Sequence, residues 1–337
     1  MKAIEYTRYG SPEVLKAVDK IKPVPKPDEV LVKIFATTVT SGDCRMRAFN
    51  VPFGFRLLGR LAMGLRGPRK TVLGTELAGE VEAVGAAVTA FRVGDPVIGF
   101  TGAGFGAHAE YVCLPETGML VKKPAGLSFE EAAAVPFGGL TALFYLRDLA
   151  KLQPGQKVLI YGASGGVGTA AVQLAKAFGA HVTGVCSTGN LELVRSLGAD
   201  VVLDYTQKDF LRNGERYDLI LETVGKYPVA RCKAALIPTG RCLMVVAGLP
   251  EYVQMLWSAV FGGKRVLAGI SAPKREDLVY LVGLIEAGRL KTVIDQRYAL
   301  AEIAAAHRYA DLGHKKGNVV ISVASPAPSA LLRAHRP

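Results

Sequence analysis

The chain has 337 residues, of which 50% are hydrophobic, and its formal net charge is +12. This length allows two domains with a large core, and the composition excludes fibrous and low-complexity proteins. Because the sequence has no run of 18 consecutive apolar residues, it predicts no membrane-spanning helix, and we expect a cytoplasmic protein without stable membrane insertion. The charge could attract nucleic acid or a polyanionic cofactor, but the basic residues are mostly scattered without an aromatic-basic module, and no nucleic-acid partner is expected.

Residues 1–124 are predicted to be rich in β-strands. Strand-like sequences cover 30–36, 77–84 and 109–114, and a turn within 92–97 starts a further strand. We therefore expect this part of the chain to form a β-rich domain.

A basic and apolar stretch lies within this part, between Cys44 and Thr75. It contains no acidic residue, and its apolar residues are interleaved with basic ones in a helical, amphipathic pattern. It could line a substrate cleft, accept an anionic or lipophilic substrate, touch a membrane surface, or form a solvated helix over the mouth of a cleft. The basic residues are Arg45, Arg47, Arg56, Arg60, Arg66, Arg69 and Lys70.

A different pattern begins at Ser128, which forms a capping box with Glu131 at the start of a predicted helix. Strands and helices then alternate. The predicted strands are 158–163, 181–186, 201–205, 218–224, 242–248 and 266–270, and the predicted helices are 167–179, 190–198, 229–237 and 275–287. Six strands in such alternation are typical of a doubly wound parallel sheet, here in a domain spanning 125–295.

The C-terminal part changes again, with a predicted helix at 300–312 and a strand at 318–323. This strand does not fit the open parallel sheet, so we expect residues 296–324 to return to the first domain. The tail, 325–337, contains Pro326 and Pro328 and is predicted to be disordered.

A glycine-rich loop gives the strongest functional signal. It follows a buried strand and opens a helix, and Ala163, Gly165 and Gly168 occupy the three small-residue places of a dinucleotide-binding fingerprint. Free amides at the start of the helix would bind the diphosphate. An ordinary glycine-rich turn is the alternative. The residues predicted to bind the cofactor here are Gly162, Ala163, Ser164, Gly165, Gly166, Val167 and Gly168.

The end of the second strand bears on the choice between NAD and NADP. An acidic residue there would hold the ribose hydroxyls of NAD, but residues 185–190 contain none. Ser187 and Asn190 are neutral donors that could bind a 2′-phosphate, and Tyr205 ends the third strand nearby, so the sequence favours NADPH. Ser187 could instead only cap the following helix. Gly248, at the end of the fifth strand, is also expected to contact the cofactor.

With these residues assembled, the chain resembles the medium-chain dehydrogenase/reductase superfamily, and within it the zinc-free NADPH:quinone oxidoreductase and alcohol dehydrogenase-like branch. The resemblance implies a GroES-like catalytic domain with an inserted Rossmann domain, a substrate cleft between them, and a homodimer. It is carried by LGTELAGEVEAVG (73–85), FRVGDPVIGF (91–100), GAHAEYV (106–112), AAAVPFGGLTAL (132–143), YGASGGVGTAAVQLAKAFGA (161–180), LGAD (197–200) and GHKKGNVVI (313–321).

No metal is expected. Zinc members of the superfamily place a histidine ligand in a Gly-His-Glu motif, where this chain has Thr75 between Gly74 and Glu76, and it lacks their four-cysteine lobe. Cys44 lies near the first ligand position, but with Glu76 alone it would make a poor site. Without a Lewis acid, hydride transfer to an already polarised quinone or α,β-unsaturated carbonyl becomes the expected reaction.

The resemblance implies that residues 40–43 form a turn beside the nicotinamide, with Thr40 in place of the usual asparagine. The candidate catalytic residues are therefore Thr40, as a donor to the substrate oxygen, and Asp43, as a residue that orients the loop. Thr141, in a turn that starts a helix, is expected to contact the cofactor. Loop capping is the alternative for all three. Two other functions stay open: a zinc-independent alcohol or aldehyde dehydrogenase, and a non-catalytic NADPH-binding regulatory protein.

Overall fold

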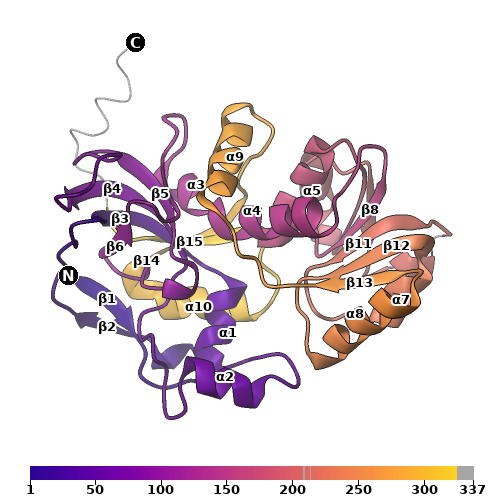
Figure 1. Cartoon of the computed structure of the whole chain (residues 1–337), viewed down its shortest axis with the longest axis horizontal. Helices are drawn as coiled ribbons and strands as arrows, with labels where there is room; N and C mark the ends of the chain where they lie inside the picture. The colour runs from indigo at the N-terminus through magenta and orange to yellow at the C-terminus, as the bar shows by residue number, and fades with distance from the viewer. Residues whose placement is uncertain (208, 213, 325–337) are drawn as a thin grey trace.

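The computed structural model describes residues 1–207, 209–212 and 214–324, so the predicted disorder of 325–337 lies outside the described residues. In the described residues the strands form a two-stranded, a six-stranded and a seven-stranded sheet. Figure 1 shows the seven-stranded sheet on the left and the six-stranded sheet on the right. The chain therefore combines a β-rich part and a parallel α/β part, as expected.

The six-stranded sheet is parallel throughout and has the order β10-β9-β8-β11-β12-β13. Its strands are β8 (Lys157–Tyr161), β9 (His181–Cys186), β10 (Val201–Asp204), β11 (Tyr217–Glu222), β12 (Leu236–Met244) and β13 (Arg265–Ala268). This confirms the doubly wound sheet. The strand order reverses between β8 and β11, and the carboxyl ends of such strands border the crevice where open α/β sheets bind ligands.

Helices cover both faces of this sheet because its strands are apolar on both sides. Val158 and Ile160 of β8 pack in one core cluster, whereas Leu159 and Tyr161 pack in another. The first cluster includes residues of α4 (Pro136–Leu143), α5 (Gly166–Ala177), α6 (Leu191–Ser196) and α9 (Arg275–Glu286), and the second includes residues of α7 (Val229–Ala234) and α8 (Leu249–Phe261).

Some boundaries differ from the sequence-based prediction for local reasons. The helix predicted at 229–237 ends at Ala234, because Leu236 already pairs with Tyr217 as the first residue of β12. The predicted strand 242–248 accordingly begins earlier, and it ends at Met244. The first strand ends at Tyr161 rather than at 163, because Gly162 turns the chain with a φ of +80°.

The seven-stranded sheet joins the two ends of the chain. Its path is β14-β15-β3-β4-β5-β7, with β6 also paired to β3. The C-terminal strand β15 runs antiparallel to β3, and β14, which the sequence did not predict, runs parallel to β15. The strands are β3 (Glu29–Val39), β4 (Glu76–Val84), β5 (Pro96–Phe100), β6 (Tyr111–Pro115), β7 (Leu120–Lys122), β14 (Ile294–Ala299) and β15 (Asn318–Ser322), and β1 (Lys2–Glu5) pairs with β2 (Lys16–Asp19) beside them.

Four further helices belong to this part or connect it to the parallel sheet: α1 (Ser41–Ala48), α2 (Arg56–Met63), α3 (Phe129–Ala133) and α10 (Ile303–Asp311). Helix α10 packs on α1 and on β14 and β15. Among the described residues we find no helix with the length and apolar character needed to cross a bilayer.

Candidate functional site

The glycine loop between β8 and α5 lies at the reversal point of the parallel sheet. A Cβ atom on Gly162 would lie 2.5 Å from Thr223 Oγ1, and one on Gly168 would lie 2.0 Å from the carbonyl oxygen of Gly162. Neither position leaves room for a side chain. These two glycines therefore let strand, loop and helix approach one another closely, as the fingerprint requires.

Gly165 differs from these two because its open side faces away from the protein. It is the N-cap of α5 with ordinary extended backbone angles, and a Cβ atom there would contact only the Gly162 carbonyl oxygen, at 3.5 Å. No acidic residue lies in the first turn of α5. The free amides of this turn and the open space at Gly165 fit a bound diphosphate.

A segment from the C-terminal part of the chain closes one side of the loop. The Gly317 amide donates to the carbonyl oxygen of Ser164 at 2.7 Å, and Gly317 also forms a parallel bridge with Gly165. The Lys315 ammonium lies 3.1 Å from the point where a Gly166 Cβ would be. Desolvation lowers the pKa of Lys315. The segment thus places a lysine at the start of α5.

The sequence analysis did not assign Lys315 a role. The motif GHKKGNVVI served there only as a carrier of the family resemblance, because nothing local to residues 313–318 says which loop they contact. Their position follows from the return of β15 to the first sheet.

The residues predicted to bind the ribose form a small polar group. The Asn190 amide nitrogen donates to Ser164 Oγ at 3.1 Å and to Ser187 Oγ at 3.2 Å, and its buried carbonyl oxygen has no partner among the described residues. Serine hydroxyls can donate or accept, so either orientation of the amide leaves one polar atom free. A free buried polar atom beside the loop fits a ligand hydroxyl or phosphate.

The third strand brings a carboxylate that the second strand lacks. Asp204 pairs with Cys186 across β10 and β9, and its side chain accepts hydrogen bonds from Thr188 Oγ1 at 2.6 Å and Thr206 Oγ1 at 2.7 Å. The next residue, Tyr205, is 40% exposed and its ring lies 5.9 Å from that of Tyr161. Sequence analysis missed Asp204 because it looked for an acidic residue only at the end of the second strand.

Thr40 and Asp43 form a capping box at the start of α1. Thr40 Oγ1 donates to Asp43 Oδ2 at 2.5 Å and accepts from the Asp43 amide at 3.1 Å, while Asp43 Oδ1 accepts from the Gly74 amide at 3.0 Å. Both side chains are buried. The loop-capping alternative is therefore present in the structure, and Asp43 connects α1 to the Gly-Thr-Glu segment.

Glu76 is a buried carboxylate that sequence analysis treated only as a poor metal ligand. It accepts a hydrogen bond from Thr38 Oγ1, and its second oxygen accepts from the Phe137 amide, at the start of α4, at 2.6 Å. Burial raises the pKa of Glu76 to about 7, and nearby Lys315 opposes this shift. Thr141, the predicted cofactor contact, donates to the Phe137 carbonyl oxygen at 2.7 Å.

Cys44 and Glu76 do not come together with a third ligand. Cys44 Sγ lies 3.5 Å from His307 Nδ1, whereas both Glu76 oxygens are engaged as described above. In the part of the chain that the structure describes, no three His, Cys, Asp or Glu side chains are grouped so that they could hold a metal ion.

The basic and apolar stretch reaches the parallel sheet next to Gly248. The Leu249 amide donates to the Phe53 carbonyl oxygen at 2.9 Å, and a Cβ atom on Gly248 would lie 3.0 Å from that same oxygen. On α1, desolvation lowers the pKa of Arg45, and Glu222 at the end of β11 opposes this shift. The stretch thus covers Gly248, and the Arg45 charge interacts with that of Glu222 at the end of β11.

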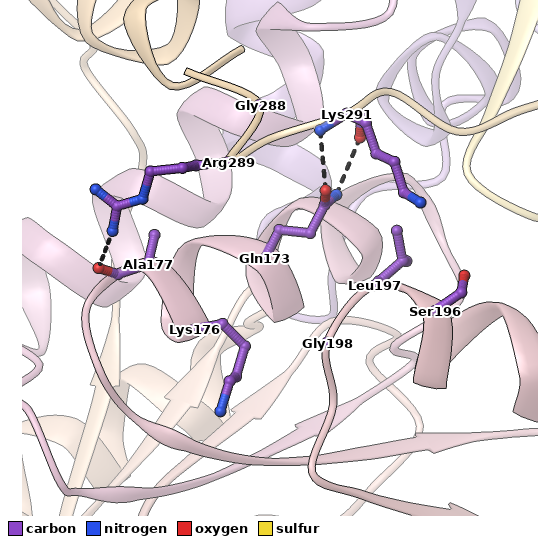
Figure 2. Close-up of a pocket in the computed structure, with 9 residues that line it drawn as sticks. All are labelled: Gln173, Lys176, Ala177, Ser196, Leu197, Gly198, Gly288, Arg289 and Lys291. Carbon is purple, nitrogen blue, oxygen red and sulfur yellow. Dashed lines mark hydrogen bonds between the residues drawn. The ribbon is translucent and has the colours of Figure 1, made fainter. Parts of the chain in front are cut away.

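A separate cavity lies at the far end of α5. It has a volume of about 390 Å³ and is lined by Gln173, Lys176, Ala177, Ser196, Leu197, Gly198, Gly288, Arg289 and Lys291 (Figure 2). Arg289 donates there to the carbonyl oxygen of Ala177, the last residue of α5, at 2.7 Å. This end of the helix is about 18 Å from the glycine loop, given the rise of 1.5 Å per residue. The cavity therefore does not belong to the glycine loop.

Two family models match the chain: the alcohol dehydrogenase GroES-like domain over residues 26–125 and the zinc-binding dehydrogenase over 197–321. Among curated proteins, the chain is 35% identical to a chloroplastic quinone-oxidoreductase homolog of Spinacia oleracea, covering 95% of this chain and 98% of that protein. It is 34% identical to a 2-methylene-furan-3-one reductase of Solanum lycopersicum, covering 95% and 79%.

Solved structures agree over nearly the whole chain. The quinone oxidoreductase from Coxiella burnetii superposes with a TM-score of 0.84 at 32% identity, covering 96% of this chain and 99% of that one. A mycobacterial protein solved as a complex with NADPH superposes with a TM-score of 0.80 at 26% identity, covering 96% and 100%.

Proposed function

The chain belongs to the zinc-free quinone oxidoreductase branch of the medium-chain dehydrogenase/reductase superfamily, and on this premise we propose that it transfers hydride from NADPH to a quinone or an α,β-unsaturated carbonyl. The proposal rests mainly on the open space beside Gly165, which lies at the start of α5 where backbone amides are free. Relatives named for quinone and furanone reduction, and one solved with NADPH, support it.

The glycine loop and its neighbours bind and orient the cofactor in this proposal. The amides from Gly165 to Gly168 bind the diphosphate, and Lys315 supplies a compensating positive charge. Ser187, Asn190 and Tyr205 receive the 2′-phosphate, while Asp204 stays bound to its two threonine partners. Thr141 and Gly248 border the cofactor on the side of the cleft.

The nicotinamide, when bound, supplies the hydride. The protein must then stabilise the negative charge that develops on the acceptor oxygen, which hydrogen-bond donors in a desolvated cleft do well. We propose Thr40 for this contact: its hydroxyl hydrogen, donated to Asp43 in this structure, would turn to the acceptor oxygen, while the Asp43 amide still donates to the hydroxyl oxygen. We add Arg45 as a second donor, since its guanidinium has no ion pair or hydrogen bond with the described residues. Replacing Arg45 with methionine should then lower kcat with little effect on the Kd for NADPH.

The same proposal assigns 1–124 and 296–324 to the catalytic domain and 125–295 to the cofactor domain, in a cytoplasmic homodimer that acts on small molecules. Sedimentation velocity measures the oligomeric state directly. A monomer at micromolar concentration would contradict the homodimer without affecting the proposed reaction.

The decisive experiment follows oxidation of NADPH and NADH by their near-ultraviolet absorbance with a panel of quinones, enones, aldehydes and alcohols, with and without a chelator. We expect turnover with quinones or enones, a preference for NADPH, and no effect of the chelator. Tight NADPH binding without turnover of any acceptor would instead support a regulatory protein. Chelator-resistant turnover of alcohols alone would support an alcohol dehydrogenase.

A further inference from the structure

Two helices on one side of the molecule expose most of their apolar side chains. On α2 and the loops beside it, Phe53, Leu57, Leu58, Leu61 and Leu65 are between 49% and 79% exposed. On α8, Leu249, Val253, Leu256, Trp257, Val260 and Phe261 are between 47% and 76% exposed. We call these two sets together the apolar face. A set of this size is larger than the scattered exposed apolar residues of ordinary surfaces.

Helix α2 is amphipathic with its apolar side turned outward. The Arg60 guanidinium stacks on the rings of Tyr9, at 4.7 Å, and Phe49, at 4.1 Å. Leu57 and Leu61 share a side of the helix at i and i+4 spacing, and both are exposed. No residue of α2 is buried. This arrangement is the opposite of that in a helix that packs on its own core.

Helix α8 has apolar residues on two sides. Tyr252 and Met255 pack against the core of the parallel sheet, and Ser258 is buried. The exposed residues 249, 253, 256, 257, 260 and 261 follow one another at helical spacing and form a single stripe along the other side. This stripe has no partner among the described residues that would account for its composition.

The two helices belong to one continuous surface. The loop before α2 meets the start of α8 through the hydrogen bond from the Leu249 amide to Phe53, and the rings of Phe55 and Tyr252 lie 5.7 Å apart in edge contact. Figure 1 shows α2 and α8 along the same lower edge of the molecule. Whatever covers one helix is therefore placed to cover the other.

The charge around the apolar face is mainly positive, and the one carboxylate within α8, that of Glu251, accepts a hydrogen bond from the Gly248 amide at 2.8 Å. Residues 44–75 and 252–275 contain no acidic residue. Exposed cations in these segments are Arg56, Arg66, Arg69, Lys70, Arg265 and Lys274, and none of them forms an ion pair with a described carboxylate. A second copy of the chain would bring like charges together here, whereas an anionic surface would neutralise them.

We propose that the apolar face docks the protein on an anionic membrane surface, with α2 and α8 lying in the interface. Exposed leucine, phenylalanine and tryptophan flanked by arginine and lysine is the pattern of interfacial helices, whose affinity combines buried apolar area with attraction to anionic lipids. The apolar face also adjoins Gly248. If the proposed function holds, a lipophilic quinone in the membrane would thus have a short path to the cleft.

The fluorescence of Trp257 can report on this contact, because Trp257 is the single tryptophan of the chain and lies in the apolar face. The test mixes the full-length protein with vesicles of phosphatidylcholine alone or with 30 mol% phosphatidylglycerol, at low and high salt. We expect a blue shift of the emission and co-sedimentation with the anionic vesicles, and a loss of both in high salt. Quenching by brominated acyl chains would place the indole below the headgroups.

Two matched variants test the location. In Leu57→Ser/Leu61→Ser we expect vesicle affinity to fall at least about tenfold, since two exposed leucines no longer enter the lipid. The control variant, Ile21→Ser/Val93→Ser, removes two apolar side chains outside the apolar face that are 95% and 65% exposed. Its vesicle affinity should stay within about twofold of that of the wild type. All four positions are exposed, so folding should be preserved, and circular dichroism checks it.

Three results would overturn the proposal: no co-sedimentation with anionic vesicles at low salt, co-sedimentation without a shift of the Trp257 emission, or equal losses in both variants. A dimer that dissociates in Leu57→Ser/Leu61→Ser while the wild type ignores vesicles would identify a second copy as the occupant. Binding is measured without cofactor or substrate, so its failure would leave the proposed reaction untouched.

Discussion

The backbone amide of Gly317 donates a hydrogen bond of 2.7 Å to the carbonyl oxygen of Ser164. This contact connects the C-terminal segment to the glycine loop, and the bridge between Gly165 and Gly317 extends it. The loop that would bind a diphosphate is therefore held in place by residues just before the last strand of the other sheet. Both sheets contribute to one site, which explains why cofactor binding should depend on residues far from the fingerprint.

Lys315 provides the first prediction. Replacing it with methionine removes the charge at the start of α5 while keeping most of the side-chain volume, so the Kd for NADPH should rise roughly tenfold. Isothermal titration calorimetry measures this. The control is Lys316→Met, because Lys316 is exposed and its ammonium has no partner among the described residues, while its backbone amide donates to Asp295 at 2.8 Å. Equal Kd values for the two variants would rule out the role of Lys315.

Substitutions of Gly165 and Gly168 in the loop should have different effects on cofactor binding and on stability. Gly165→Leu places a side chain in open space, so the free energy of unfolding should change by less than about 1 kcal/mol while NADPH binding is lost. Gly168→Ala places a methyl group 2.0 Å from the Gly162 carbonyl oxygen, so it should destabilise the protein by about 1–3 kcal/mol. Urea unfolding and calorimetry on both variants check this. If Gly165→Leu binds NADPH normally, the diphosphate lies elsewhere.

The parallel sheet could be predicted because its signals are local. Each strand is a short apolar run, each helix has its own periodicity, and the glycine loop follows a strand directly. The boundaries predicted at 229–237 and 242–248 were wrong because a local helical pattern competed with strand pairing. Leu236 fits the helical pattern of the sequence, but in the structure it is buried and pairs with Tyr217. Strand β14 was missed because its sequence, IDQRYA, has little apolar alternation and depends on pairing with β15.

The candidate site was only partly predictable because several of its residues meet across long sequence separations. Ser164 was selected as part of the fingerprint, and Ser187 and Asn190 by their distance from it, and the structure brings the three together. Lys315 and Asp204 were not selected, since their roles depend on which strands become neighbours. The outward apolar side of α2 also follows from tertiary structure, because contacts such as the stacking of Arg60 on two rings fix which side faces the protein.

Ser187 tests the choice of cofactor. In Ser187→Asp a carboxylate at the end of β9 would repel a 2′-phosphate and could accept from ribose hydroxyls, so the Kd for NADPH should rise at least roughly tenfold while that for NADH changes far less. Ser196→Asp adds the same charge to an exposed serine of α6 and should alter neither. Fluorescence titration of both reduced cofactors measures the ratio. Parallel losses for NADPH and NADH would show that Ser187 does not face the phosphate.

Glu76 should make the stability of the protein depend on pH. Its pKa is raised by burial from 4.5 to about 7, so between these values the folded state holds a proton that the unfolded state has released. The free energy of unfolding should therefore fall as pH rises through this range, by about 3 kcal/mol in total, because each pKa unit corresponds to about 1.4 kcal/mol. Below pH 4.5 the contribution is complete.

The substitution Glu76→Gln isolates this contribution. An amide oxygen can still accept from the Phe137 amide, but it does not titrate, so the variant should lose the decline between pH 4.5 and 7 and should equal or exceed the wild type in stability at pH 8. Urea unfolding across this pH range gives the difference between the two curves, in which other titrating groups cancel. Glu80→Gln, at a half-buried position on the same strand, should keep the wild-type slope. If Glu76→Gln keeps that slope too, the Glu76 carboxylate is ionised throughout and Lys315 compensates its charge fully.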